Sequence, residues 1–218
     1  MPPPLQNILN EEILYVDVLL DLDKLDNSKL EEFLADKLNV MVAIYFYCKL
    51  NMSDNLNYIL NIVTNYTELY EYIKNNKAIN DFLCLACHNN YYDIVKILLE
   101  FGADSNYLDA KPLLIAVRQN NINITELLLK HGADVNNVSD KVLQLCCKNN
   151  NFEILKLFID KDIYLLDSYK NLLDLCLENK SGECTKLLMK YASEHIDCNT
   201  FNNLKTFDEE DFLEFSDN

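Results

Sequence analysis

A pattern of apolar residues that recurs every thirty residues constrains this 218-residue chain more than any other feature. Residues 111–136 read KPLLIAVRQNNINITELLLKHGADVN, and most of their apolar positions fall on apolar positions thirty residues earlier and thirty and sixty residues later. A chain of this kind builds one small unit several times and buries its apolar residues between neighbouring units. The three partner segments are residues 81–106, 141–166 and 171–196.

Each unit is predicted to contain two helices. Leu113, Ile115 and the small Ala116 indicate a short helix that needs close contact, and Ile124, Leu127 and Leu128 have the i, i+3, i+4 spacing of one helix face. The turn between the helices suits a residue that tolerates the left-handed conformation, and the second helix should end at a glycine with positive φ. The turn position holds Asn90, Asn120, Asn150 and Lys180, and the end position holds Gly102 and Gly132.

Two motifs within this pattern resemble the ankyrin repeat. Pro112 and Leu113 begin the first helix, and the run Gly-Ala-Asp-Val-Asn at 132–136 follows the second helix. The resemblance implies an all-α fold, an ankyrin-repeat solenoid of four 30-residue helix-turn-helix units with short loops. We expect repeats at 77–106, 107–136, 137–166 and 167–196, with a helical N-terminal cap at 1–76 and an acidic tail at 197–218.

The N-terminal region shows helical spacing without the thirty-residue register. Ser28 with Glu31 resembles a capping box that opens a helix ending near residue 38. The apolar, aromatic residues 40–50 predict a buried packing helix, and residues 56–63 and 69–73 predict two more helices that form a degenerate first repeat.

Charge and hydropathy exclude several function classes. The net charge is −16, from 35 acidic and 19 basic residues, which disfavours a nucleic-acid partner. It indicates either a charged surface that keeps the protein soluble and monomeric or a basic protein partner. No apolar run approaches the roughly 20 residues that cross a bilayer, and the first twenty residues contain three acidic residues and no basic one, unlike a signal peptide. We expect a soluble monomer in the cytoplasm, with the nucleus as an alternative.

The cysteine and histidine residues could in principle attach a haem or bind zinc. Cys84, Cys87 and His88 spell the C-x-x-C-H pattern of haem attachment, and with Cys146 or Cys147 they offer zinc ligands. The first set lies inside a predicted repeat helix, and the second lies two repeats away, where stacked units do not touch. We therefore interpret cysteine as a small buried apolar residue, and expect no metal, cofactor, small-molecule substrate or enzymatic activity.

The resemblance implies contact positions just after the small residues of each first helix and at the loop tips. Tyr107, Tyr169 and Arg118 are the strongest candidates, because aromatic residues and arginine dominate interface hot spots. The predicted partner-binding residues are Tyr107, Leu108, Asp109, Arg118, Gln119, Asn137, Val138, Lys148, Asn149 and Tyr169, and the same positions elsewhere hold His88, Asn89, Glu178 and Asn179.

The sequence is compatible with three functions from different classes, of which the third is disfavoured by the helical position of the cysteines. The first is a binding module for another protein; in repeat style and in its Asn-, Lys-, Ile- and Tyr-rich composition the chain resembles ankyrin proteins of giant viruses and poxviruses, which implies a host-interaction factor in the host cytoplasm. The second is a substrate adaptor of a ubiquitin ligase with an F-box-like N-terminal region. The third is a metal or haem protein. The tail TFDEEDFLEFSDN is either a solvated segment or a docking motif.

Overall fold

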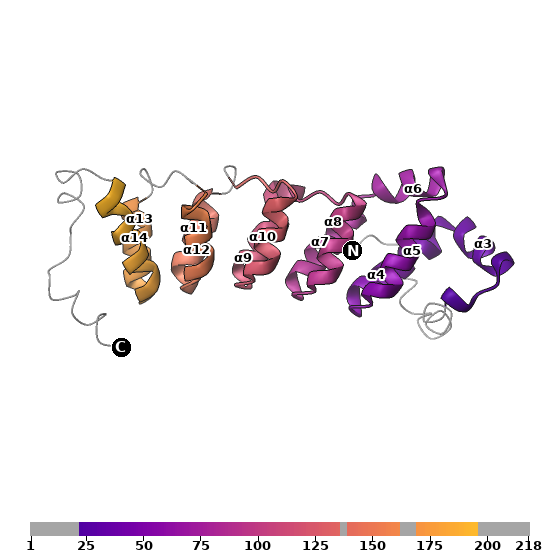
Figure 1. The fold of residues 1–218 in the computed structure, drawn as a ribbon, viewed down its shortest axis with the longest axis horizontal. Helices are drawn as coiled ribbons and strands as arrows, with labels where there is room; N and C mark the ends of the chain where they lie inside the picture. Colours follow the sequence, from indigo (N-terminus) through magenta and orange to yellow (C-terminus); the bar gives the residue numbers. More distant parts are fainter. Residues whose placement is uncertain (1–21, 136–138, 162–168, 196–218) are drawn as a thin grey trace. The chain divides into compact units, whose positions relative to one another are not determined.

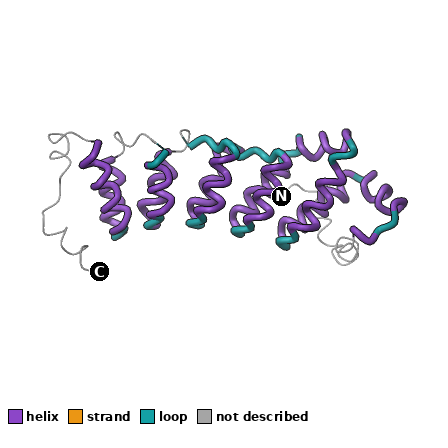
Figure 2. Tube along the Cα trace, in the orientation of Figure 1, coloured by secondary structure: helices purple, strands orange, loops and turns teal. Residues whose placement is uncertain are grey.

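The computed structural model describes residues 22–135, 139–161 and 169–195 (Figure 1). All regular structure in these residues is helical, with twelve α-helices and one short 3-10 turn and no strand (Figure 2). The all-α prediction is confirmed. The chain divides between Tyr107 and Leu108 into two compact units, which we describe separately.

The first unit contains two stacked helix pairs. Helix α4 packs against α5 and α7 against α8; α4 also contacts α7, and α5 contacts α8. The first helices of the two pairs, α4 and α7, therefore pack on each other, and so do the second helices, α5 and α8. Helix α6 follows the α4–α5 pair and contacts both helices of that pair. The elements are the 3-10 turn Leu22–Lys24, α3 (Asn27–Ala35), α4 (Lys37–Lys49), α5 (Ser53–Val63), α6 (Thr67–Lys74), α7 (Ala78–His88) and α8 (Tyr92–Phe101).

The α4–α5 pair lies inside residues 1–76, where the sequence predicted a degenerate repeat formed by residues 56–63 and 69–73. The structure instead pairs the helix over 56–63 mainly with α4. Asn51, at the turn of the α4–α5 pair, has φ 57°, as Asn90 has φ 60° at the turn between α7 and α8. The two turns are thirty-nine residues apart because α6 intervenes, so this pair does not fit the thirty-residue period. The boundary at residue 76 remains a prediction.

Helix α4 is the buried packing helix that the sequence indicates, with seven buried residues between Val40 and Cys48. The start of α3 differs from the predicted capping box. Asp26 is the cap, and its carboxylate accepts a hydrogen bond from the Lys29 backbone N–H at 2.9 Å. An aspartate two residues before Ser28 can satisfy the same free N–H groups, and its negative charge suits a helix N-terminus.

The second unit stacks its helix pairs in the same way. Helix α11 contacts α12 and α13, α12 contacts α10 and α14, and α13 contacts α14. Its core contains the leucine column Leu113, Leu143 and Leu173, each at most 4% exposed. The elements are α9 (Tyr107–Arg118), α10 (Ile122–Lys130), α11 (Ser139–Asn149), α12 (Phe152–Ile159), α13 (Tyr169–Glu178) and α14 (Gly182–His195), with Tyr107 itself in the first unit.

The predicted turn conformations are confirmed at every described position. Asn120, Asn150 and Lys180 have φ of 52°, 54° and 55°, so the left-handed conformation belongs to the position rather than to asparagine. Gly102 and Gly132, with φ of 107° and 85°, occupy the predicted helix ends.

Two buried hydrogen bonds join neighbouring helix pairs of the second unit. The Asn151 side-chain amide donates to the Val117 carbonyl at 2.6 Å, and the Ser181 hydroxyl donates to the Cys147 carbonyl at 2.5 Å. Asn151 and Ser181 are thirty residues apart and each precedes a second helix, and the two carbonyls lie near the ends of the preceding pair's first helices. The Ser181 hydroxyl supplies a donor to a carbonyl near a helix end, whereas the Val117 carbonyl also accepts from the Asn120 backbone N–H at 3.0 Å.

Candidate functional site

The first helices carry one half-exposed apolar residue at the same position in every pair. These residues are Phe46, Leu85, Ile115, Leu145 and Leu175, while their neighbours one position later, from Tyr47 and Ala86 onward, are buried. Within each unit, these half-exposed side chains form an apolar stripe on the first helices.

In the second unit this stripe is flanked by side chains four residues before and three residues after it. Positions i, i+4 and i+7 lie along one face of a helix. We call the surface the first-helix face; it consists of Lys111, Ile115 and Arg118 on α9, Lys141, Leu145 and Lys148 on α11, and Asn171, Leu175 and Glu178 on α13.

The first-helix face is cationic on α9 and α11. Both helices present a basic, an aliphatic and a second basic residue in the same order, and all four basic side chains are exposed. None of the four forms an ion pair with another residue of the described part of this unit. Lys170, at the start of α13, adds a fifth exposed cation, and the nearby acidic residues in sequence are Asp109, Asp140, Asp174 and Glu178.

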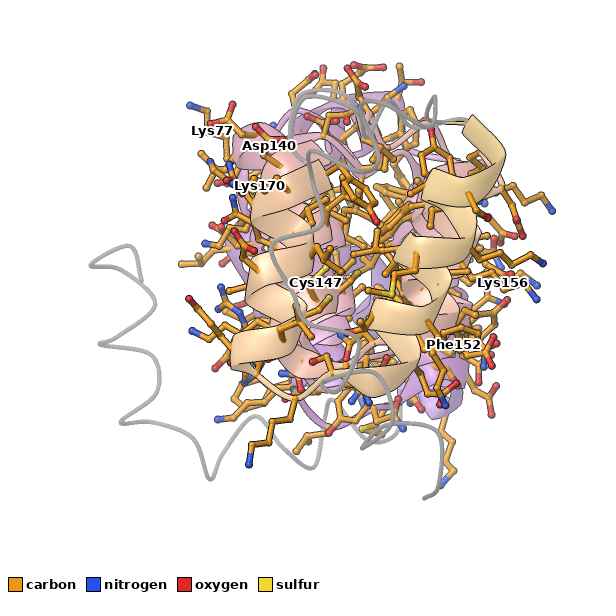
Figure 3. The ribbon with its side chains drawn as sticks, turned by 90° about the vertical axis from the view of Figure 1, so that its left-hand side faces the viewer. Lys77, Asp140, Cys147, Phe152, Lys156 and Lys170 are labelled. Carbon is orange, nitrogen blue, oxygen red and sulfur yellow. The ribbon has the colours of Figure 1, made fainter. Side chains whose placement is uncertain are left out.

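The predicted contact residues after the small positions lie at the end of this face. Arg118 and Lys148 are exposed members of it, and Asn149 is exposed beside Lys148, whereas Gln119 is half-buried. Figure 3 shows Lys170 and Asp140 on the side of the first helices of this unit and Lys156 of α12 on the opposite side.

The predicted tip, in the first residues of α9, has an unusual backbone. Leu108, Asp109 and Ala110 all have positive φ, between 49° and 55°, and the regular helix begins after them. Leu108 is 58% exposed, the most exposed large apolar side chain in the described part of the chain, as expected for an apolar tip. Non-glycine residues in this conformation are strained, so the surrounding structure must hold the backbone of this segment in place.

Tyr107, by contrast, is engaged within the first unit. Its hydroxyl forms a hydrogen bond with the Asp81 carboxylate of α7, and desolvation together with that carboxylate raises the pKa of the phenol. The side chain is half-buried, so part of the ring remains accessible.

The prediction that Tyr169 lies exposed at a tip is wrong. Tyr169 is the first residue of α13 and is only 1% exposed. Most of a tyrosine side chain is an apolar ring, and its burial outweighs the cost of one hydroxyl. That hydroxyl has no hydrogen-bond partner among the described residues.

Replacing Tyr169 by Phe should raise the free energy of unfolding by about 1 kcal/mol, because the change removes a buried polar group that lacks a partner. Chemical denaturation followed by circular dichroism measures the difference. Tyr45→Phe, in the first unit, is the matched control and should change stability by less than about 0.5 kcal/mol. A destabilised Tyr169→Phe protein would show that the hydroxyl is satisfied.

The same substitution should change the response to alkali. Burial, and more weakly Cys176, raise the pKa of Tyr169 to about 12, whereas an unfolded tyrosine titrates near 10. Keeping the phenol neutral in the folded state therefore contributes fully to the free energy of unfolding below pH 10, and this contribution is lost as pH rises towards 12. The wild-type protein should lose on the order of 2 kcal/mol more than Tyr169→Phe over this interval.

The described cysteines behave as buried apolar residues, as predicted. All seven are buried, with no disulfide among them, and burial raises the pKa of the Cys48, Cys87 and Cys146 thiols. Hydrogen bonds with Cys147 and Cys184 raise the pKa of Cys176, and the hydrogen bond with Cys176 lowers the pKa of Cys184. The thiols whose pKa is raised stay protonated and are poor nucleophiles. Among the described residues, no group of three or more His, Cys, Asp or Glu side chains could hold a metal ion.

Several predicted features fall outside the described residues. These are Asn137 and Val138, the F-box-like opening within residues 1–21, and the acidic tail from residue 197. Among the helices that the structure does describe, none combines the length and the apolar composition required to cross a bilayer.

The sequence-based prediction of contact residues missed the half-exposed apolar stripe. Its signal was present, since position 85 and its equivalents are apolar in every repeat, but a repeating apolar column was interpreted as core. Helical spacing alone does not separate a fully buried residue from one at the edge of the buried face.

A comparison with protein-family models matches residues 41–139 to the model described as ankyrin repeats (3 copies). The match begins in α4 and extends to the first residue of α11, so it includes the α4–α5 pair and supports the resemblance noted in the sequence. None of the curated proteins compared matches the chain. Ankyrin repeats are generally protein–protein interaction modules and are typically non-enzymatic. Neither comparison bears on a viral origin or on ligase recruitment.

Proposed function

We propose that this chain, which contains ankyrin repeats, is a non-enzymatic binding module whose first-helix face contacts another protein. The observation that carries the proposal is the repeated cation–aliphatic–cation order on α9 and α11, with no ion pair to use these cations within the described part of the unit. Exposed aliphatic side chains contribute area on binding, and the flanking charges select the partner.

The local charge of the first-helix face indicates a different kind of partner from the one that the net charge of the whole chain suggests. The net charge of −16 favours a basic partner, but residues 37–196 carry 19 acidic and 16 basic residues, so most of the excess negative charge lies in residues 1–36 and 197–218. Within the Debye length of about 8–10 Å at physiological salt, the local cations govern contact. A ligand of this face therefore carries carboxylates around apolar side chains.

Affinity capture from the cells that naturally make the protein tests the proposal. The double variant Arg118→Glu, Lys148→Glu should reduce capture of the bound partner at least tenfold, because like charges then face each other across the interface. The matched control Lys130→Glu, Lys156→Glu reverses two exposed lysines on second helices of the same pairs and should retain capture. Equal loss in both variants, or no loss in either, would place the binding site elsewhere.

The tip at Leu108 is a second contact region of the same module. Its exposed side chain stands on a strained backbone segment in the first residues of α9. In the same capture experiment, Leu108→Ser reports whether the tip contributes to binding.

A further inference from the structure

The first-helix face of the second unit and residues 206–218 have complementary chemistry. The face presents Lys111, Arg118, Lys141 and Lys148 around the half-exposed Ile115 and Leu145. Residues 206–218 contain six acidic residues arranged around four large apolar ones: Asp208, Glu209, Glu210, Asp211, Glu214 and Asp217, with Phe207, Phe212, Leu213 and Phe215.

We propose that residues 206–218 bind in cis to the first-helix face formed by α9 and α11. In this complex the carboxylates pair with the four basic side chains, and the aromatic rings cover the aliphatic side chains between them. Aromatic rings supply large contact area at low entropic cost, and several charge pairs around an apolar centre are stronger together than exposed pairs taken singly.

The chain between the last described helix and the acidic segment is long enough. Helix α14 ends at His195, and residues 196–205 can span about 35 Å when extended. Packed helices lie about 8–10 Å apart, so the path from α14 past α13 to α11 is on the order of 20–30 Å. Contacts of α14 with α13, and of α13 with α11, establish this order of helices.

Linkage to the same chain favours this occupant over a free ligand. A short linker holds the attached segment at an effective concentration in the millimolar range. Even a weak interaction, with a dissociation constant near 1 mM, is therefore occupied much of the time. α13 contributes little to the site, since it presents Asn171 and Glu178 where the other two helices present cations.

The consequence for binding depends on the proposed function of this face. A protein that uses the first-helix face must displace residues 206–218, so the segment lowers the affinity of acidic ligands and blocks weak ones. The binding of the segment itself requires no outside partner and can be tested on the isolated full chain.

Zero-length carbodiimide cross-linking of the full-length protein, followed by mass spectrometry, tests the proposal. Within cross-linked monomers, carboxylates of residues 208–217 should be joined to Lys111, Lys141 and Lys148 at least five times more often than to Lys130 and Lys156. The last two are also exposed lysines, but on second helices. Adding 0.5 M sodium chloride should remove this preference, because it screens exposed charges.

Variants of the full chain separate charge recognition from lysine reactivity. Neutralising the segment by Glu209→Gln, Glu210→Gln and Asp211→Asn should reduce cross-links from its remaining carboxylates, Asp208 included, to the level of the control lysines. Lys148→Arg keeps the charge but loses the reactive amine, so cross-links at Lys141 should persist. Equal yields at face and control lysines would overturn the proposal, and so would cross-links found only in covalent dimers, which would assign the segment to a second copy. Neither result would depend on the capture experiment.

Discussion

Replacing Phe158 by Ala should lower the free energy of unfolding by about 3–5 kcal/mol. Phe158 lies in α12 and is fully buried, so truncation removes its apolar contacts and leaves a cavity that the packed helices close only in part. Since α12 contacts both α10 and α14, the cavity weakens the stacking of neighbouring pairs as well as one helix.

Phe152→Ala is the matched control for this experiment. Phe152 begins the same helix but is half-buried, and Figure 3 shows it near the outer edge of the unit. Its truncation should cost less than half as much. Urea unfolding followed by circular dichroism compares the two proteins. Equal losses would mean that the core of the α11–α12 pair does not lie where the structure places it.

Replacing Asn151 by Ala should destabilise the protein by about 1 kcal/mol, the typical net contribution of one intramolecular hydrogen bond. The Asn151 amide does not cap α12 but donates to the Val117 carbonyl of the preceding pair, and the side chain is 2% exposed. Removing the amide breaks a direct link between stacked pairs and leaves the buried Val117 carbonyl with the Asn120 backbone N–H as its donor.

Two further substitutions test this explanation. Asn151→Ser introduces a hydroxyl donor like that of Ser181 at the equivalent position. It should therefore be less destabilised than Asn151→Ala. Asn179→Ala removes an exposed amide that donates only to Leu175 within its own helix pair, so it should cost less than about 0.5 kcal/mol. Similar losses for Asn151→Ala and Asn179→Ala in denaturant titrations would contradict a structural role for the link between pairs.

The predictions that rested on the repeat period and on turn conformation are confirmed, whereas the predicted capping box at Ser28 is not, since Asp26 caps α3. The thirty-residue period located four helix pairs, and the turn residues adopt positive φ because asparagine tolerates it and glycine has no Cβ to oppose it. Lys180 has the same conformation although it is not asparagine, which shows that the surrounding pair imposes the turn. The α4–α5 pair escaped the period because α6 lengthens the connection to α7.

The candidate site was less predictable than the fold. Arg118 and Lys148 are exposed on the first-helix face, and Leu108 is exposed at the tip. Tyr169 was expected at another tip because it aligns just beyond a loop position, but it is buried. A tyrosine has an apolar ring and a polar hydroxyl, so its sequence position does not decide between a core and a surface place.

Periodic spacing and backbone tolerance are properties that each residue carries along the chain, and they were sufficient to predict two helices per unit, the turn between them and the glycine at the end. Burial depends on which helices meet, and so does the choice of hydrogen-bond partner. Only the stacked structure therefore shows that Asn151 and Ser181 bind carbonyls of the preceding pair, that Tyr169 belongs to the core, and that the apolar column at Ile115 and Leu145 stays half-exposed between lysine and arginine side chains.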